Sequence, residues 1–365
     1  MKAQPLLETQ ALIPSVSEDG TPVFCLLAKR TYDIRGGAAE RAERVYPMVL
    51  VDRYWDDGDA ETSTVREESD LYPYKVATDV AVIGSARAPG GRPTTQMDVV
   101  VTVGGKGKAV RVIGDRYCIW REGLAPEFTE PESFTEMPLR YDRAYGGEDA
   151  CSDPMQPFYY PRNQRGTGVA VSNLPQVVNG LQLPNLEDPR DLLTPERVVF
   201  GQTDAWVRQP MPQSVGWFPA PFYPRCSFVG SVPGLLDPDT VMPEELLGLV
   251  PRGQIALARQ FKLPSFDVRF NNGASPGLAF PTLAGGEEVR IIGMTADGEL
   301  RFRLPTEKPQ LMLDIGVGES VLSPALHTVC VRVDDAQVDL VWRGAHPYPG
   351  VEWLPEMRRL VASVN

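Results

Sequence analysis

Residues 97–112 read MDVVVTVGGKGKAVRV, and this stretch decides the fold that the sequence predicts. Apolar and polar side chains alternate over residues 97–103, which is the two-residue period of a strand with one buried face. The glycines of residues 104–107 suit the positive φ angles of a tight turn, and Val110 and Val112 resume the alternation. The stretch therefore predicts a β-hairpin.

Further strands are predicted on both sides of this hairpin. Residues 76–83 form a strand that ends at an Ala-Pro-Gly-Gly break before the hairpin starts, and three consecutive strands without a helix imply an antiparallel sheet. Residues 10–35 indicate two more strands, and residues 45–54 a third. In the last third of the chain, strands are predicted at residues 268–270, 288–294, 300–304, 311–315, 328–333 and 338–343.

Differences in residue composition and in strand pattern divide the chain into regions. We expect an N-terminal antiparallel β region at 1–121, a Pro-rich and aromatic-rich loop region at 122–233, a short helical segment at 234–262 and a C-terminal β region at 263–365, which ends in a helix at 354–361. The 33 glycines and 35 prolines favour turns over long helices. The expected fold is mainly β, with antiparallel sheets packed as a sandwich or barrel-like unit, long loops and a few short helices.

Charge and composition exclude several classes of partner. The formal net charge of −12 disfavours nucleic acid, because neutralising phosphates requires clustered Lys and Arg. The five cysteines are far apart and odd in number, which is typical of reduced, mostly buried thiols. The chain begins without a basic region followed by an apolar run, and no stretch of 18 apolar residues occurs. We therefore expect a soluble cytoplasmic protein with no membrane partner.

Known catalytic and metal-binding patterns match the sequence poorly. Residues 273–277, GASPG, fit the G-x-S-x-G elbow of serine hydrolases, but Pro276 lacks the backbone N–H that would help to hold an oxyanion. Ser275 is therefore not predicted as a nucleophile. The two histidines, His327 and His346, have no ligand at a metal-binding spacing. We expect no catalytic residues, no metal and no cofactor.

Two interpretations of the chemistry remain open. Carboxylate-containing turns such as those at Asp142 and Glu148 keep a hydrolase of saccharide or peptidoglycan as an alternative, because glycosidases use two carboxylates across a cleft. The other interpretation is an interface for a protein partner, because the loop region combines aromatic and arginine side chains, which commonly anchor interfaces. The candidate contact residues are Tyr160, Arg162, Arg165, Trp217, Phe218, Tyr223 and Arg225. These aromatic side chains could equally form a satellite core that folds the loops onto the sheet.

Several segments carry a family resemblance. They are DLYPYK at 70–75, MPLRYDRAYGG at 137–147, PRNQRGTG at 161–168, FDVRFN at 266–271 and LVWR at 340–343. In order and spacing, from about residue 23 to residue 347, the chain resembles β-rich accessory proteins encoded in bacterial type VI secretion clusters, near PAAR-domain spike tips, VgrG spikes and toxin effectors. It departs from that pattern at Pro276–Gly277 and is only loosely similar over 202–225.

The resemblance implies an adaptor or chaperone rather than an enzyme. Such a protein would bind a secreted effector, a PAAR protein or a VgrG spike protein and help to load the cargo on the spike. Its work would be stoichiometric binding, with no bond made or broken.

Overall fold

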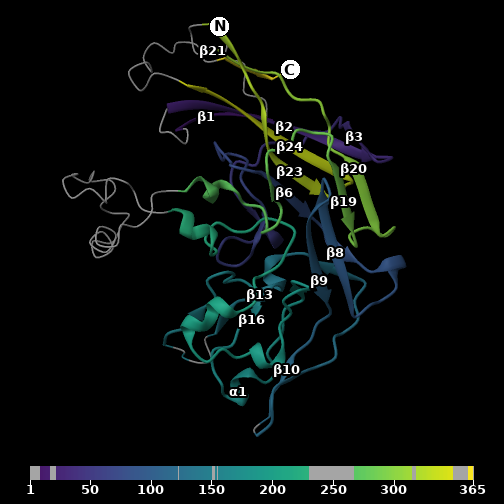
Figure 1. Cartoon of the computed structure of the whole chain (residues 1–365), viewed down its shortest axis with the longest axis vertical. Helices are drawn as coiled ribbons and strands as arrows, with labels where there is room; N and C mark the ends of the chain where they lie inside the picture. The colour runs from purple at the N-terminus through teal and green to yellow at the C-terminus, as the bar shows by residue number, and fades with distance from the viewer. Residues whose placement is uncertain are drawn as a thin grey trace, which may run out of the picture.

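The computed structural model describes residues 9–16, 22–121, 123–149, 153, 155–229, 267–314, 318–347 and 361–364. Within these residues the fold is mainly β, with several antiparallel sheets and few short helices, as the sequence predicts (Figure 1). The predicted helical segment at 234–262 lies outside the described residues. The predicted terminal helix does too, apart from Val361, which begins a strand.

A seven-stranded sheet forms the centre of the structure. Its order is β1–β2–β24–β23–β6–β18, and β3 pairs with β2 beside this path. The strands are β1 (Gln10–Val16), β2 (Pro22–Arg35), β3 (Ala38–Arg41), β6 (Thr78–Ile83), β18 (Ala279–Phe280), β23 (Ala325–Arg332) and β24 (Gln337–Pro347). Strands from the two ends of the sequence thus lie in the same sheet.

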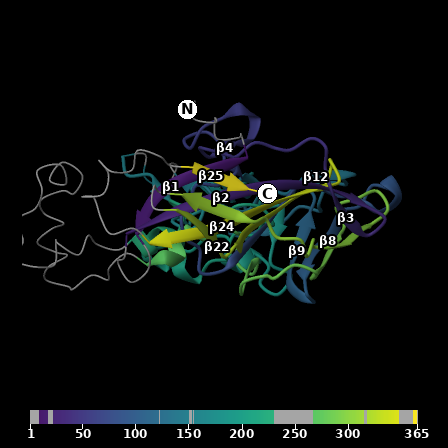
Figure 2. The same ribbon diagram turned by 90° about the horizontal axis from the view of Figure 1, so that it is seen from above.

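A five-stranded antiparallel sheet contains the predicted hairpin. Its order is β17–β9–β8–β19–β20, and the turn between β8 and β9 has positive φ angles at Gly104 and Gly105. The strands are β8 (Gln96–Val103), β9 (Lys106–Ile113), β17 (Leu186–Glu187), β19 (Glu288–Ile292) and β20 (Glu299–Arg303). In the view from above, β8 and β9 lie to one side of β2 and β24 (Figure 2).

The two sheets share one hydrophobic core. Alternate side chains of β8, such as Val99 and Val101, pack in the same cluster as Val329 of β23 and Leu340 of β24. On β2, Tyr32 joins this cluster, whereas Phe24 and Leu26 pack with Leu311 and Leu313 of a third sheet. That sheet has the order β22–β21–β25, with β21 (Leu311–Asp314), β22 (Glu319–Leu322) and β25 (Val361–Val364).

A lobe of short elements and loops, formed by residues 117–129 and 145–209, has its own core in the lower part of Figure 1. Buried Tyr145, Tyr160 and Leu183 belong to this core. Its paired elements include β13 and β16, which run parallel. Its elements are β10 (Cys118–Ile119), β11 (Glu127–Phe128), β13 (Tyr145–Gly146), β14 (Glu148–Asp149), β15 (Phe158–Tyr159), β16 (Thr167–Gly168), α1 (Pro175–Val178), η4 (Pro195–Arg197) and η5 (Thr203–Arg208). Between them in sequence, β12 (Glu136–Pro138) and η3 (Tyr141–Arg143) place Met137 and Tyr141 in the core shared by the two sheets.

The remaining short elements connect these layers. They are β4 (Arg53–Tyr54), η1 (Trp55–Asp57), β5 (Val65–Glu67), β7 (Ser85–Arg87), η2 (Pro89–Gly91), η6 (Arg225–Val229) and η8 (Val268–Asn271).

Three local predictions are wrong. The strand at 76–83 does form, as β6, but it joins the central sheet beside β23 in a parallel pair rather than the sheet of the hairpin. Residues 45–54 are mostly irregular, because only Arg53–Tyr54 pairs with another strand, β5. Residues 268–270 lie in a 3₁₀ helix, since the side chain of Asp267 accepts a hydrogen bond from the backbone of Arg269 and caps a turn.

Candidate functional site

One face of the central sheet is polar and yet buried. Alternation along β2 places Lys29 and Thr31 on the face opposite to the Tyr32 core side chain. Asp339 of β24 is the strand partner of Thr31, and Lys29 and Asp339 are 4% and 0% exposed. Because burying an unpaired charge is costly, these side chains require partners from the chain that covers them.

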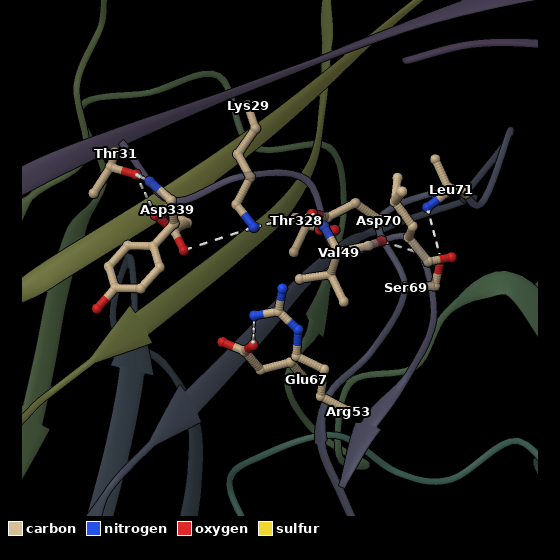
Figure 3. Close-up of polar contacts among 12 residues, drawn as sticks. Lys29, Thr31, Val49, Arg53, Glu67, Ser69, Asp70, Leu71, Thr328 and Asp339 are labelled. Atoms are coloured by element: carbon tan, nitrogen blue, oxygen red, sulfur yellow. Dashed lines mark hydrogen bonds and ion pairs between the residues drawn. The ribbon is translucent and has the colours of Figure 1, made fainter. Parts of the chain in front are cut away.

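The partners come from residues 45–77, which we call the covering segment. The ammonium group of Lys29 lies 2.9 Å from Oδ2 of Asp70 and 3.8 Å from Oδ2 of Asp339 (Figure 3). Thr31 donates its hydroxyl hydrogen to Asp339 at 2.6 Å. The carboxyl group of Asp70 also accepts a hydrogen bond from the backbone of Val49, at 2.8 Å. The covering segment is thus attached to the sheet by ion pairs and hydrogen bonds.

Glu67 extends this network toward solvent. Its carboxylate forms ion pairs with Arg332 of β23 and, at 2.9 Å, with Arg53 of β4. Burial opposes the charge of Glu67, but Arg332 outweighs it and lowers the pKa of this carboxyl group. Burial likewise opposes the charge of Lys29, but Asp70 and Asp339 raise its pKa. These groups therefore stay ionised at neutral pH.

A second buried network connects the covering segment to distant loops. Lys75 lies 2.6 Å from Asp79 of β6 and 3.5 Å from Glu68, and Glu68 lies 2.5 Å from Arg225. Burial raises the pKa of Glu68, although Arg225 and Lys75 act in the opposite direction. A side chain at Gly273 would clash here, because an added Cβ would lie 2.2 Å from Oε1 of Glu68.

Next to the first network the surface is hollowed by about 390 Å³. We call this hollow the charged groove. It is lined by Glu67 and Arg332 of the network and by residues that include Tyr46, Asp52, Arg53, Tyr54, Asp57 and Asp335.

The charged side chains of the groove differ in whether they form ion pairs. Arg332 binds Glu67 and Asp339, and its guanidinium carbon lies 4.2 Å from the ring centre of Tyr46. Asp335 accepts a hydrogen bond from the Tyr46 hydroxyl group at 3.1 Å. Within the described residues, the carboxylates of Asp52, Asp57 and Asp335 form no ion pair. Arg66 also lines the groove and forms no ion pair in the described residues, where its guanidinium group lies over Trp55. Three carboxylates without an ion pair thus outnumber one such guanidinium group, so the groove has an excess of negative charge.

The predicted contact residues are placed mostly in the interior. Tyr160 and Phe218 belong to hydrophobic clusters, and Trp217 packs with Val65 of β5. Arg225 is buried as well, and Tyr223 is 39% exposed. Burial agrees with the alternative in which these aromatic side chains fold the loops onto the sheet. Their role in partner binding stays a prediction.

The two other predicted contacts, Arg162 and Arg165, are partly exposed. Arg162 donates to the backbone oxygen of Gln209 at 2.8 Å, and Arg165 to that of Ala60 at 3.1 Å. Both guanidinium groups therefore fasten loops together in the structure, and neither belongs to the charged groove.

Two of the segments that carry the family resemblance, residues 137–147 and 161–168, meet at one junction. Asn163 is fully buried, and its amide donates to the backbone oxygens of Tyr141 and Tyr145 at 2.7 and 3.2 Å. Gly146 permits this approach, because an added Cβ would lie 2.1 Å from the backbone oxygen of Asn163. Because Tyr141 packs in the core shared by the two sheets and Tyr145 in the core of the lobe, these contacts hold the lobe against the central sheets.

The hydroxyl group of Ser275 makes contacts that support the fold. Its hydroxyl group is buried, donates to the backbone oxygen of Gly216 at 2.9 Å and lies 2.7 Å from the hydroxyl oxygen of Tyr141. These contacts connect the GASPG stretch to the junction around Asn163. They occupy the hydroxyl hydrogen that a nucleophilic serine would give to a base.

The carboxylates and histidines considered in the sequence have different surroundings in the structure. Asp142 is tied to the guanidinium group of Arg140, and Glu148 is exposed in β14. Burial lowers the pKa of His327 well below its ordinary value, so this side chain is neutral. The described residues contain no group of three or more His, Cys, Asp or Glu side chains arranged to hold a metal ion.

Sequence patterns did not single out the two networks or the charged groove. One signal was present, since Lys29, Arg30 and Thr31 interrupt an otherwise apolar strand. The groove itself is made by residues 46–67 and 332–335, whose proximity depends on the fold.

The comparisons with known proteins identify a family. The chain matches the model of a family described as "Uncharacterized protein conserved in bacteria (DUF2169)" over residues 19–343. The protein therefore belongs to this bacterial family. Searches of curated proteins and of solved structures find no match. Among the described residues, no helix is long and apolar enough to cross a membrane.

Proposed function

We propose that the protein is an accessory protein of type VI secretion. It acts as an adaptor or chaperone that binds an effector or a PAAR-type cargo and assists its loading on the VgrG spike. The resemblance of residues 137–147 and 161–168 to accessory proteins of such secretion clusters supports this proposal. Both segments also form an ordered junction of the fold, so the likeness covers residues that shape the molecule.

The observation that carries the proposal is an exposed apolar pair beside a charged groove. Leu50 and Val51 are 62% and 73% exposed, and they directly precede Asp52 and Arg53 of the charged groove. Single exposed apolar side chains are common on protein surfaces. Two in succession at the rim of a charged groove combine the apolar centre and the polar rim that are typical of protein interfaces.

Binding would shield the partner until it reaches the spike. An apolar segment of the partner can cover Leu50 and Val51, or a partner strand can pair with an open sheet edge. Such an edge is β1, which in the described part of the chain has β2 as its strand neighbour. Neither mode requires a reaction.

Affinity purification tests this function. The tagged protein is purified from cells that express the secretion cluster and from cells that lack it, and the co-purified proteins are identified by mass spectrometry. We expect enrichment of an effector, PAAR or VgrG protein in the first sample. No enrichment, or turnover of peptidoglycan or saccharide by the purified protein, would contradict the proposal.

A surface variant shows which region binds. Leu50→Ser with Val51→Ser should reduce capture of the partner at least fivefold, because it removes apolar contact area. Val321→Ser in β22 is the matched control, since Val321 is similarly exposed on another sheet. Equal capture by the double variant and the control would exclude the Leu50–Val51 pair as the binding surface.

A further inference from the structure

We infer that the charged groove docks a basic, extended segment of the protein partner. An arginine or lysine side chain of that segment lies against Asp52, Asp57 and Asp335, and its apolar neighbours cover Leu50 and Val51. This inference rests on the proposed function, which it deepens by naming the chemistry of the partner and the surface that receives it.

The hollow has the shape for a side chain from another molecule. At about 390 Å³ it is open to solvent and lies between the covering segment and the turn after β23. Its inner side is closed by Glu67 and Arg332, which are buried and bound to each other. An incoming group therefore meets the rim carboxylates and leaves the inner ion pair intact.

The pairing of charges selects a cation. Arg332 binds Glu67 and Asp339, and Arg53 binds Glu67, so both guanidinium groups already have carboxylate partners within the fold. The carboxylates of Asp52, Asp57 and Asp335 form no ion pair in the described residues, and they outnumber the remaining lining cation, Arg66, which lies over Trp55. A partner guanidinium or ammonium group would supply it, and a partial loss of water in the groove would strengthen the attraction.

Aromatic rings in the same region favour arginine. The guanidinium group of Arg332 stacks over Tyr46, and those of Arg66 and Arg140 lie over Trp55 at 5.2 and 5.5 Å. Tyr54 also lines the groove. A planar cation on a partner can use the same type of contact.

Other occupants fit less well. Nucleic acid would be repelled by the rim carboxylates and by the net charge of −12. A bare metal ion would need several converging ligands, and no such group occurs among the described residues. A basic peptide satisfies both the charge of the groove and the apolar side chains beside it.

The test uses a defined probe and a matched pair of double variants. The probe is a fluorescent, acetylated peptide of alternating arginine and leucine, compared with a peptide that has glutamine in place of arginine. The groove variant is Asp57→Asn with Asp335→Asn, because asparagine tolerates the positive φ angle of Asp57. The control is Asp204→Asn with Asp297→Asn, which changes the net charge equally at two exposed sites.

Fluorescence polarisation at low and physiological salt measures binding. We expect the groove variant to bind the arginine peptide at least tenfold more weakly than the wild type and the control variant, and the glutamine peptide to bind weakly to all three. Equal weakening in both double variants would show attraction by net charge alone and would overturn the inference. Equal binding of the two peptides by the wild type would overturn it as well.

Capture of the natural partner separates this inference from the proposed function. If the groove variant still captures secretion proteins from cells as the control does, the adaptor function stands and the groove is not its docking site. If neither the wild type nor the variants capture secretion proteins, the proposed function fails, whatever the peptide measurement gives.

Discussion

The ammonium group of Lys29 lies 2.9 Å from the carboxylate of Asp70, and this contact joins the central strand β2 to the covering segment. Both side chains are buried, so removing one leaves the other as an unpaired charge. We expect Lys29→Met to lower the free energy of unfolding by about 3 kcal/mol, as is typical for breaking a buried ion pair. Urea unfolding measures the change.

The matched control for Lys29 is an exposed ion pair on the same strand. Arg35 lies 2.9 Å from Asp33, and its side chain is 70% exposed. Arg35→Met should change the free energy of unfolding by less than about 1 kcal/mol, because solvent screens such pairs. Equal losses in the two variants would show that burial does not govern the strength of the Lys29–Asp70 contact.

Arg225 connects three parts of the chain through one guanidinium group. It lies 2.5 Å from Glu68 and donates to the backbone oxygens of Phe218 at 2.7 Å and Phe270 at 2.8 Å. Arg225→Met should therefore lower the free energy of unfolding at pH 7.5 by about 3 kcal/mol. Arg269→Met, which breaks an exposed ion pair with Asp267, should cost less than about 1 kcal/mol.

The loss in Arg225→Met should depend on pH. Burial already raises the pKa of Glu68 in the wild type, and removal of Arg225 would raise it further. A carboxyl group with a raised pKa binds its proton more readily in the folded state, so the folded state gains stability as pH falls toward the ordinary value. The deficit relative to wild type should therefore be smaller at pH 5.5 than at pH 7.5. A larger deficit at pH 5.5 would contradict this account of Glu68.

Asn163 supports the junction between the lobe and the central sheets. Asn163→Ala would leave the buried backbone oxygens of Tyr141 and Tyr145 without this donor. We expect a loss of about 2 kcal/mol, because unsatisfied buried polar groups keep their desolvation cost. Hydrogen exchange followed by mass spectrometry should show faster exchange within residues 117–209. Gln164→Ala, an exposed neighbour, is the control, and similar exchange in both variants would disprove a specific role for Asn163.

Local sequence patterns predicted where strands form better than they predicted which strands pair with each other. The β8–β9 hairpin follows from alternation and glycines within 16 residues, so nearby residues suffice to specify it. The parallel pairing of Thr328 with Asp79 joins distant parts of the chain, and no local signal encodes it. Residues 45–54 alternate weakly, and Val49 donates its backbone N–H to the side chain of Asp70 instead of to a strand. A side chain thus took the place of the predicted sheet partner.

Residue type alone also failed to separate core residues from surface residues. Tyr160 has the composition of an interface residue, yet its hydroxyl group donates to the backbone oxygen of Pro210 at 2.9 Å inside the lobe. Leu50 and Val51 have the composition of core residues, yet they are exposed. The covering segment can leave them exposed because other residues hold it on the sheet, through the ion pairs Lys29–Asp70 and Arg332–Glu67 and through buried Val65.

Lys108 has a buried amine whose burial the charge of Asp188 offsets only in part. It follows the β8–β9 turn, and in the described part of the chain its ammonium nitrogen has no hydrogen-bond partner. Burial lowers the pKa of Lys108 to about 7, against an ordinary value of 10.5. Lys108→Met should raise the free energy of unfolding at pH 7 by about 1 kcal/mol, because it removes an unsatisfied polar group and keeps the apolar stem.

The pH dependence of stability gives the sharper test of Lys108. Between pH 7 and 10.5 the unfolded chain keeps the proton that the folded chain has lost, so the wild type should gain stability as pH rises. Lys108→Met should lack that gain between pH 7 and 9.5, whereas Lys106→Met, at an exposed position of the same hairpin, should retain it. Parallel stability curves for the wild type and Lys108→Met would mean that the amine of Lys108 reaches solvent and keeps an ordinary pKa.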